Sequence, residues 1–427
     1  MNRQEWIDWI WLAEAIARSG GTFRKLIGHF NRPRELLVAD EATIRAIPDL
    51  TEHNVKGLMN KDLTAATEIF DACDRLGISV LPYDAETFPQ TLREIPDPPV
   101  LLYYVGKIPD FERLFCIGMV GTRKMSESGL QNGYRLAYEL ASAQALIISG
   151  LAEGIDGVCA VGAVEGGGKT VAVVGCGLDV AYPRHHGKLM NHIVESGGAI
   201  LSEYPPGTRP MHYHFPVRNR IISGLSQLVI VVEAGTASGS LITAKEAISQ
   251  GRTVYAVPAD TGIAAAEGNN QLLRDGAKVA LEAQDIVDRY RYVFEARPLS
   301  ERVIPWKGIA DREALRRYGV IGFERESQGP TESKERPTPK RTEDSASAEK
   351  DTGRPVPKAE PKTVPDEILQ SLSPVQKAVL EAMPDDVPVT AETIKTEYPF
   401  GEVLAALTML EILGIVRKLP GSMYGKI

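Results

Sequence analysis

The sequence lacks several features that would narrow its function at once. Only four of the 427 residues are cysteines, and 48 Lys and Arg stand against 56 Asp and Glu, a formal charge of −8. The cysteines lack the paired spacing of a disulfide framework or a zinc site, which predicts buried thiols in a reducing cytosol. Any contact with nucleic acid must be local, because no overall positive charge attracts it. The cysteines are Cys73, Cys116, Cys159 and Cys176.

Long hydrophobic runs are also missing. The most apolar stretch near the start, residues 6–17, is interrupted by Asp8 and Glu14. It is too short and too charged to cross a bilayer, and it has neither the basic start nor the small-residue cleavage site of a signal peptide. We therefore expect a cytoplasmic protein with no membrane partner.

Between residues 115 and about 290, short apolar runs alternate with segments of helical length. This alternation predicts an α/β fold with a doubly wound parallel sheet and helices on both faces. The expected strands are Ile78–Leu81, Val100–Val105, Cys116–Val120, Leu146–Ile148, Val171–Val174, Ala199–Leu201, Leu228–Val232 and Val254–Val257. The expected helices include Glu127–Ala143, Ile155–Glu165 and His186–Ser196.

Glycine and small polar residues follow several of these strands. In a doubly wound sheet, ligands bind beyond the carboxyl ends of the strands, and glycine lets backbone N–H groups approach an anion closely. The sequence therefore predicts an anion site built by these loops. They are residues 121–123 (GTR), 149–156 (SGLAEGID), 175–179 (GCGLD), 202–204 (SEY) and 235–240 (GTASGS).

Two common nucleotide-binding fingerprints fail in this chain. After Gly175 and Gly177, the third position of a GxGxxG pattern is Val180. The segment Gly168–Thr170 is not a P-loop, because the glycine expected five residues earlier is Ala163. We therefore expect no nucleotide cofactor, and we interpret Lys169 as an ordinary loop lysine.

The stretch from Ser202 to Ala244 combines three chemically useful parts. A basic loop carries arginines beside aromatic residues, an apolar strand ends at Glu233, and a turn of small residues leads into a helix N-terminus. Guanidinium groups and a helix N-terminus suit phosphates, and aromatic rings can stack on unpaired bases. The basic loop contains Arg209, His212, Tyr213, His214, Phe215, Arg218 and Arg220.

The two ends of the chain predict accessory domains. Residues 1–76 have the pattern of a small helical packing domain, and 77–297 contain the sheet. Residues 298–364 are expected to be a linker, disordered from about 325, because 325–363 contain almost no large apolar residue. Residues 365–427 predict a winged helix with helices at 375–383, 391–397 and 402–413. The third helix is acidic, which favours a contact with protein over the reading of DNA.

Together these stretches resemble the DNA-processing protein A (DprA/Smf) family of bacterial single-strand DNA binders. The similarity rests on MVGTRKMSESG (119–129), HFPVRNRIISGLS (214–226), GNNQLLRDGA (268–277) and intervening segments of residues 115–280. It implies a Rossmann-like core that binds single-stranded DNA without catalytic turnover. It also implies a homodimer that loads a RecA-type recombinase during natural transformation.

Residue by residue, the resemblance implies a G-S/T-R phosphate loop at Gly121–Arg123, a stacking role for Phe215 and a Ser-Gly-Ser turn at Ser238–Ser240. His212 departs from the lysine that the family often carries there. With the glycine loops, the expected DNA- and phosphate-binding residues are Gly121, Thr122, Arg123, Ser149, Gly150, Gly154, Gly175, Gly177, His212, Phe215, Arg218, Asn219, Arg220, Ser238, Gly239 and Ser240.

Three alternatives stay open at this point. The Arg218–Arg220 segment can instead hold its loop to the sheet through hydrogen bonds. The core is also similar to nucleoside-monophosphate phosphoribohydrolases around Glu233–Thr236, although the paired glycines and the spacing of their catalytic glutamate are absent. A metal site among five histidines is disfavoured, because neither cysteine nor a paired carboxylate motif accompanies them. These are His185, His186, His192, His212 and His214.

Overall fold

The computed structural model describes residues 2–290, 305–306, 308–322, 372–384 and some of the residues from 389 to 426. The chain divides into two compact units, Met1–Thr331 and Glu332–Ile427. None of the helices in the described residues is both long enough and apolar enough to span a membrane.

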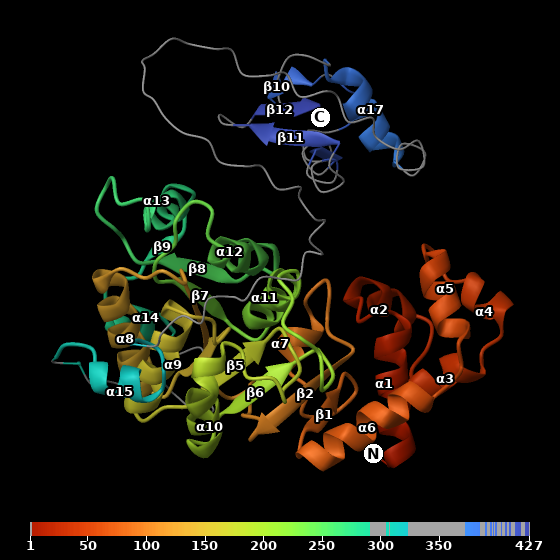
Figure 1. Cartoon of the computed structure of the whole chain (residues 1–427), viewed down its shortest axis with the longest axis horizontal. Helices are drawn as coiled ribbons and strands as arrows, with labels where there is room; N and C mark the ends of the chain where they lie inside the picture. Colours follow the sequence, from red (N-terminus) through yellow and green to blue (C-terminus); the bar gives the residue numbers. More distant parts are fainter. Residues whose placement is uncertain are drawn as a thin grey trace, which may run out of the picture. The chain divides into compact units, whose positions relative to one another are not determined.

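Nine strands of the described residues form one sheet in the first unit, in the order β1-β2-β6-β5-β4-β3-β7-β8-β9 (Figure 1). The strands from β6 to β9 are parallel, whereas β1 and β2 run antiparallel to their neighbours. The predicted doubly wound sheet is thus confirmed, and its central strands end within one residue of the expected positions. The strands are β1 Ser79–Pro82, β2 Leu101–Gly106, β3 Cys116–Val120, β4 Leu146–Ser149, β5 Thr170–Val174, β6 Ala199–Ser202, β7 Leu228–Val231, β8 Thr253–Ala256 and β9 Lys278–Val279.

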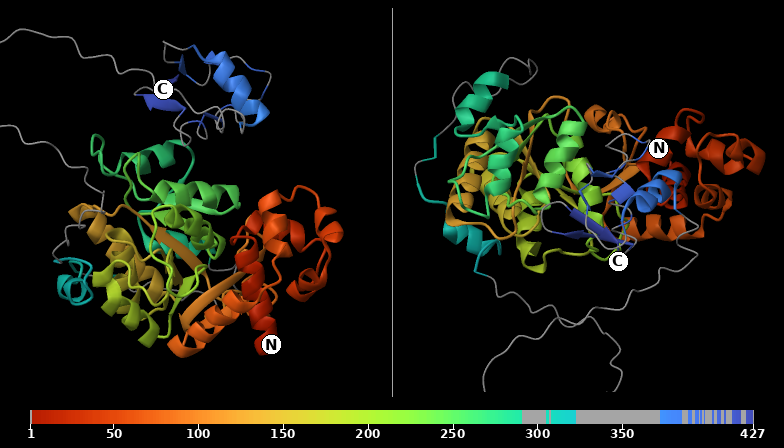
Figure 2. Two further views of the ribbon diagram at one scale, coloured as in Figure 1. Left: turned by 45° about the vertical axis from the view of Figure 1, so that its right-hand side comes forward. Right: turned by 90° about the horizontal axis from the view of Figure 1, so that it is seen from above.

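The central strands are apolar on both faces because helices cover both faces (Figure 2). Helices α8 (Glu127–Ser142), α9 (Ile155–Glu165) and α14 (Ala283–Tyr290) pack on one face, and α11 (His214–Gly224) and α12 (Ser240–Ser249) pack on the other. The four cysteines are buried and free, as predicted. Further elements are α7 Gln90–Arg93, the 3-10 helix η1 Arg184–His186, α10 Gly187–Glu195 and α13 Glu267–Arg274.

Helix α11 corrects one expectation. The sequence was expected to form a basic loop up to the strand, but residues 214–224 are helical. Pro216 lies in the first turn, where a helix has no intrahelical partner for the backbone N–H, so it does not break the helix. Ile221 and Ile222 are buried against the sheet, which stabilises the helix through packing.

Six helices of the front part pack against the β1 side of the sheet and share its hydrophobic core (Figure 1). Trp9 and Ile10 are buried there and pack into that core. Asn2 and Glu5 form a capping box that fixes the start of the first helix. The helices are α1 Arg3–Ala15, α2 Gly20–Leu26, α3 Pro33–Val38, α4 Glu41–Arg45, α5 Glu52–Met59 and α6 Thr64–Leu76.

A strap, residues 305–306 and 308–322, folds back onto the sheet unit although it lies within the expected linker. The Trp306 ring packs against Tyr134 with the ring centroids 5.2 Å apart, and Tyr318 stacks on His192 at 4.4 Å. Helix α15 (Arg312–Arg317) buries Leu315. Apolar and aromatic side chains therefore fasten this segment, whereas residues 325–363 lie outside the described part of the chain.

The second unit contains helix α17 (Pro374–Ala382) and a three-stranded sheet in the order β10-β12-β11. Ser373 caps α17 in a capping box with Gln376, and Pro374 occupies the first turn. The expected helices at 391–397 and 402–413 fall largely outside the described residues. The strands are β10 Val389–Thr390, β11 Val416–Leu419 and β12 Met423–Lys426.

One buried side chain ties the ends of two central strands. The Asn269 amide nitrogen lies 3.0 Å from the carbonyl oxygens of Val231 and Val232 and 2.8 Å from that of Val257. We expect Asn269→Ala to lower the free energy of unfolding by about 1–3 kcal/mol, because it leaves buried carbonyls unpaired. Urea denaturation measures the loss. Asn191→Ala, on the exposed side of α10, is the control and should match the wild type; an equal loss in both variants would contradict the role of Asn269.

Candidate nucleic-acid interface

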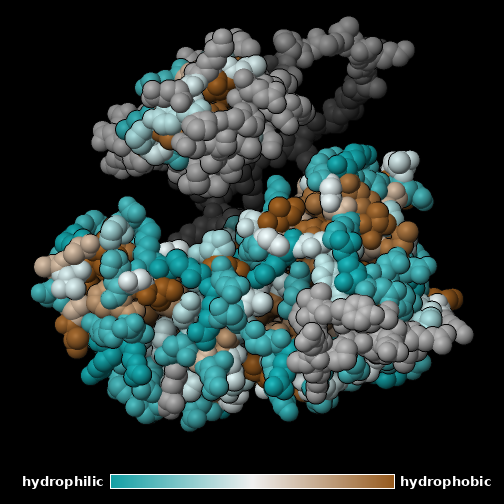
Figure 3. All heavy atoms as spheres, turned by 180° about the vertical axis from the view of Figure 1, so that it is seen from behind, coloured by the Kyte–Doolittle hydropathy of each residue, from teal (hydrophilic) through white to brown (hydrophobic). Residues whose placement is uncertain are grey.

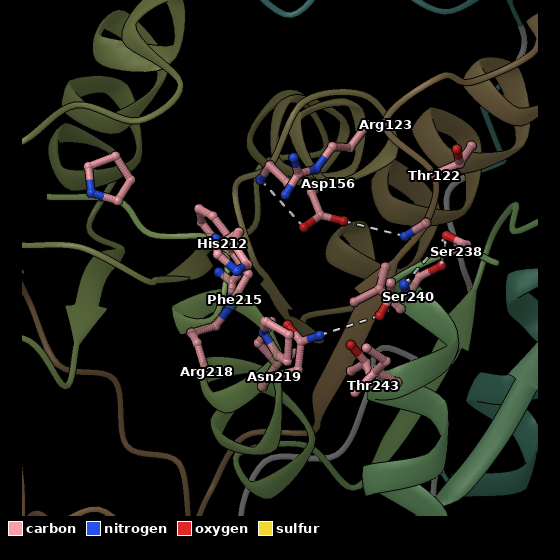
Figure 4. A pocket seen from close by; sticks show the side chains of 18 of the residues that line it. Thr122, Arg123, Asp156, His212, Phe215, Arg218, Asn219, Ser238, Ser240 and Thr243 are labelled. Atoms are coloured by element: carbon pink, nitrogen blue, oxygen red, sulfur yellow. Dashed lines mark hydrogen bonds between the residues drawn. The ribbon is translucent and has the colours of Figure 1, made fainter. Parts of the chain in front are cut away.

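A cleft of about 680 Å³ opens at the carboxyl ends of β3 and β7. These strands pair in parallel, with Ile117 opposite Leu228. The chain leaves β3 towards β4 on one side and leaves β7 towards β8 on the other. Their connections therefore diverge and leave a crevice, which is where doubly wound sheets bind ligands. Figure 4 shows the labelled side chains surrounding this space.

The loop after β3 supplies the accessible positive charge. Gly121, Thr122, Arg123 and Lys124 line the cleft, and the side chains of Arg123 and Lys124 are exposed. The Thr122 N–H donates to the Glu233 carbonyl oxygen at 2.7 Å, so the loop after β3 is fastened to the end of β7. Two cations are thus held at the mouth of the cleft without an acidic partner at hydrogen-bond distance in the described residues.

Aromatic rings form the neighbouring wall. Phe215, in the first turn of α11, stacks on Tyr182 with the ring centroids 5.3 Å apart and the planes at 27°. The Arg123 guanidinium carbon lies 5.3 Å from the centroid of the Phe215 ring, which is cation–π distance. His212 also lines the cleft beside them. This wall therefore offers stacking surfaces directly beside a positive charge.

The turn after β7 forms the opposite wall. Ser238, Gly239 and Ser240 line the cleft where α12 begins, and the hydroxyl oxygens of Ser238 and Ser240 are 2.7 Å apart. Asn219 donates from its side-chain amide to the Gly239 carbonyl oxygen at 3.4 Å. The N-terminus of a helix carries partial positive charge and unpaired N–H groups, so this wall also suits an anion.

Arg218 lines the cleft but is only 4% exposed. Its guanidinium donates to the carbonyl oxygen of Gly150 at 2.7 Å and to that of Val173, so it joins the ends of β4 and β5. Burial lowers the pKa of Arg218 to about 10, and Asp156 partly offsets this shift. Arg218 thus lines the cleft as expected but bonds to backbone carbonyl oxygens, and its contact with a phosphate stays a prediction. Arg218 is used inside the protein, which is the alternative role of hydrogen-bonding the helix to the sheet.

Asp156 occupies the position where an anion was expected. Its carboxylate accepts from the N–H groups of Gly121 at 3.3 Å, Gly150 at 3.1 Å and Ala152 at 3.4 Å. Burial raises the pKa of Asp156, and the nearby Arg218 partly opposes the rise. The glycine N–H groups of these loops therefore face a carboxylate of the protein itself.

Arg220 also departs from the expectation. It faces away from the cleft and donates to Glu203 at 2.7 Å and to Asp97 at 2.9 Å. Both Arg220 and Glu203 are buried. A guanidinium committed to two carboxylates has no charge left for a phosphate, so Arg220 joins α11 to the segment before β2.

Five more expected residues lie behind the cleft instead of lining it. At Gly150 an added Cβ would lie 2.6 Å from both the Arg218 guanidinium and the Asp156 carboxylate. Gly154 has φ +80°, and its Cβ would lie 2.4 Å from the Thr122 carbonyl oxygen. These glycines are required by close packing. The five are Ser149, Gly150, Gly154, Gly175 and Gly177.

The sequence reasoning missed four polar residues of the cleft. Lys124 was signalled by its place directly after Arg123, and Thr243 by its place in the first turn of α12. Tyr182 had no local signal, because its position depends on how distant loops meet. Asp156 stood in the predicted loop 149–156 but was not singled out there. The four are Lys124, Asp156, Tyr182 and Thr243.

The alternative sites find little support in the geometry. Glu233 is buried and is not among the residues that line the cleft, and its carboxylate accepts from the Ser126 N–H at 2.8 Å. His186 is buried with a pKa lowered to about 4 by desolvation, and its Nδ1 lies 3.0 Å from the Leu151 carbonyl oxygen. In the described part of the chain, no three His, Cys, Asp or Glu side chains are grouped to hold a metal ion.

The buried pair Arg218 and Asp156 generates a prediction about stability. We expect Arg218→Met to lower the free energy of unfolding by about 3–5 kcal/mol at pH 7, because a buried carboxylate loses its compensating charge. The exposed Arg123→Ala control should change it by less than about 0.5 kcal/mol. Urea denaturation of both variants measures the difference.

The same variant should show a dependence on pH. The pKa of Asp156 is raised in the folded state. Protonated Asp156 therefore favours folding, and this contribution to the free energy of unfolding is lost as the pH rises. Removing Arg218 raises that pKa further. The loss of unfolding free energy caused by Arg218→Met should therefore be smaller near about pH 4 than at pH 7. A deficit that is absent, or larger at the acidic pH, would contradict the pairing.

Comparisons with known proteins agree with the fold. Residues 79–291 match the family model of DNA recombination-mediator protein A, and residues 360–422 match the DprA winged helix domain. The second match confirms the predicted winged helix.

Relatives and a solved structure extend the match. DNA processing protein DprA of Streptococcus pneumoniae is 40% identical over 207 residues, which are 48% of this chain and 72% of that protein. The DprA of Bacillus subtilis is 41% identical over 212 residues, 50% of this chain and 71% of that protein. The X-ray structure of the S. pneumoniae protein aligns with a TM-score of 0.57 at 32% identity, covering 66% of this chain and 97% of that one. The chain therefore belongs to the DNA recombination-mediator protein A (DprA/Smf) family.

Proposed function

We propose that the cleft binds single-stranded DNA and holds it without transforming it. The observation that carries this proposal is the exposed Arg123 guanidinium beside the Phe215 ring, 5.3 Å from its centroid, inside a crevice that ends at the N-terminus of α12. Phosphates find positive charge on two walls, from Arg123 and Lys124 on one side and from the helix on the other.

The aromatic wall selects for unpaired bases. In a duplex, each base already stacks on its neighbours, and its faces are closed to a side chain. Phe215, backed by Tyr182, offers a ring that a base can stack on only after it leaves the duplex stack. This combination of stacking and charge supports single strands of varied sequence, because every base has a stacking face.

Among the described residues, neither Glu233 nor Asp156 is suitably placed to act as the catalytic carboxylate of a hydrolase. Glu233 fixes the start of α8 through Ser126, and Asp156 is occupied by three backbone N–H groups. A carboxylate that is buried and saturated by backbone donors is poorly placed to move a proton to or from a substrate. We therefore propose a binding role and not a phosphoribohydrolase.

The partners follow from that role. We propose that the bound strand is passed to a RecA-type recombinase during recombination in the cytoplasm, and that the winged helix contacts protein. The family membership supports a mediator that holds its substrate for transfer.

We also propose a homodimer that forms at the β9 end of the sheet. Hydrophobic side chains gather over β9 in the space-filling view (Figure 3). Val279 and Leu281 are exposed there, and β9 is an edge strand. Apolar side chains beside an open strand edge are typical of an interface.

The charge of the cleft generates a prediction about salt dependence. Arg123→Ala and Lys124→Ala should each reduce the slope of log affinity against log salt by roughly 0.7, the share of one phosphate on a single strand. Anisotropy titrations of a labelled oligothymidylate at several NaCl concentrations measure this slope. Arg113→Ala is the control, because Arg113 pairs with Asp110 before β3, outside the cleft. An unchanged slope for Arg123→Ala would exclude direct phosphate contact.

The proposed interface predicts the oligomeric state. Val279→Lys with Leu281→Lys should convert a dimer to a monomer, because buried lysines without partners oppose association. Sedimentation equilibrium measures the mass. Val38→Lys, another exposed apolar position on α3, is the matched control and should leave the dimer intact. A dimer that survives the double substitution would place the interface elsewhere.

A further inference from the structure

Exposed apolar side chains continue beyond the rim of the cleft. Tyr213 is 55% exposed, Met211 40% and Val217 46%. In the described part of the chain, Tyr213 is the one aromatic side chain among the exposed large apolar residues. We call Arg209, Met211, Tyr213 and Val217 the lip. Exposed apolar side chains that gather on one surface often mark a binding site.

The lip is continuous with the cleft along the chain. It alternates with His212 and Phe215, both of which line the cleft, and Pro210 lines it as well. The Tyr213 ring stands nearly perpendicular to two neighbours, at 83° to His212 and at 84° to His214. A base that leaves the cleft on this side would meet Tyr213 next.

The ring of Tyr213 rests on a fixed support. His214 is buried, its Nδ1 lies 3.0 Å from the Gly175 carbonyl oxygen, and its ring stacks on Tyr204 at 4.0 Å. The loop that carries Arg209 is fastened as well, because the Gly177 N–H donates to the Thr208 carbonyl oxygen at 2.9 Å. The lip is therefore held in place before a ligand arrives, which lowers the entropy cost of binding.

The charge around the lip favours a polyanion over a protein. From Tyr204 to Val232 the sequence contains no Asp or Glu, although the whole chain carries a charge of −8. Arg209 is exposed in this segment. Asp179 lies near this segment, and its carboxylate accepts the Gly207 N–H at 2.8 Å. Aromatic rings beside an arginine, without acidic residues in the segment, match the chemistry of a single strand.

We propose that the single strand leaves the cleft across the lip, with one base stacked on Tyr213 and one phosphate neutralised by Arg209. This inference rests on the proposed function of the cleft. It adds a second stacking site, so the protein contacts more nucleotides than the cleft alone holds. Short oligonucleotides that fill the cleft do not reach Tyr213, whereas longer ones do.

The test compares two lengths of oligothymidylate, about 4 and about 16 nucleotides, which span the site sizes usual for stacking grooves. Tyr213→Ala should weaken binding of the longer strand by about 5-fold or more and leave the shorter one unchanged. Tyr213→Trp should restore the loss, because it keeps a stacking ring. Arg209→Ala should reduce the salt slope by roughly 0.7 for the longer strand only, and Arg113→Ala should change neither.

Phe215→Ala separates the two proposals, because it should weaken both lengths. If Phe215→Ala weakens both and Tyr213→Ala weakens neither, the lip lies off the path and the cleft assignment stands. If Phe215→Ala has no effect, the proposed function itself fails. If Tyr213→Ala changes the sedimentation mass and leaves DNA affinity unchanged, the lip is an interface between copies of the chain, which would overturn the inference.

Discussion

The parallel pairing of β3 with β7 is the constraint on which the site depends. Hydrogen bonds hold the two strands side by side, but their connections leave in opposite directions. The sheet therefore ends in a crevice that neither connection fills. Thr122 bonds to the Glu233 carbonyl oxygen across the pair, so the loop with the exposed cations cannot drift away from the turn that starts α12. Because of this pairing, the exposed cations of the loop after β3 lie close to the Phe215 ring and to the N-terminus of α12.

Three arginines that the sequence predicts to bind phosphate have three different surroundings in the structure. Arg123 is exposed and lies over Phe215, where it can meet a phosphate. Arg218 is buried and ties the ends of β4 and β5, and Arg220 pairs with two carboxylates on the other side of α11. Burial decides between these tasks, since a desolvated guanidinium must satisfy its donors inside the protein. The buried pair also keeps α11, and with it Phe215, in a fixed position.

Segments outside the sheet contact helix α8 and the segment that holds helix α11. Arg24 of α2 donates to the carbonyl oxygens of Arg93 and Ile95 at 2.5 Å each, close to Asp97, which holds Arg220. On the other face, Arg312 of the strap pairs with Glu127 in the first turn of α8. Helix α11, which carries Phe215, and helix α8, which follows the loop with Arg123, are therefore held by parts of the chain far away in sequence.

The sequence by itself determined the sheet, because strands buried on both faces leave an unbroken apolar pattern and the turns between them are rich in glycine. It also determined ten of the cleft residues, among them Arg123, Phe215 and Ser240, because the carboxyl ends of parallel strands meet at one edge. Only the tertiary structure decided that Arg218, Arg220 and the loop glycines such as Gly150 serve the fold, since exposure and partners are set by distant contacts. The same holds for Tyr182, which reaches Phe215 through packing that no local pattern records.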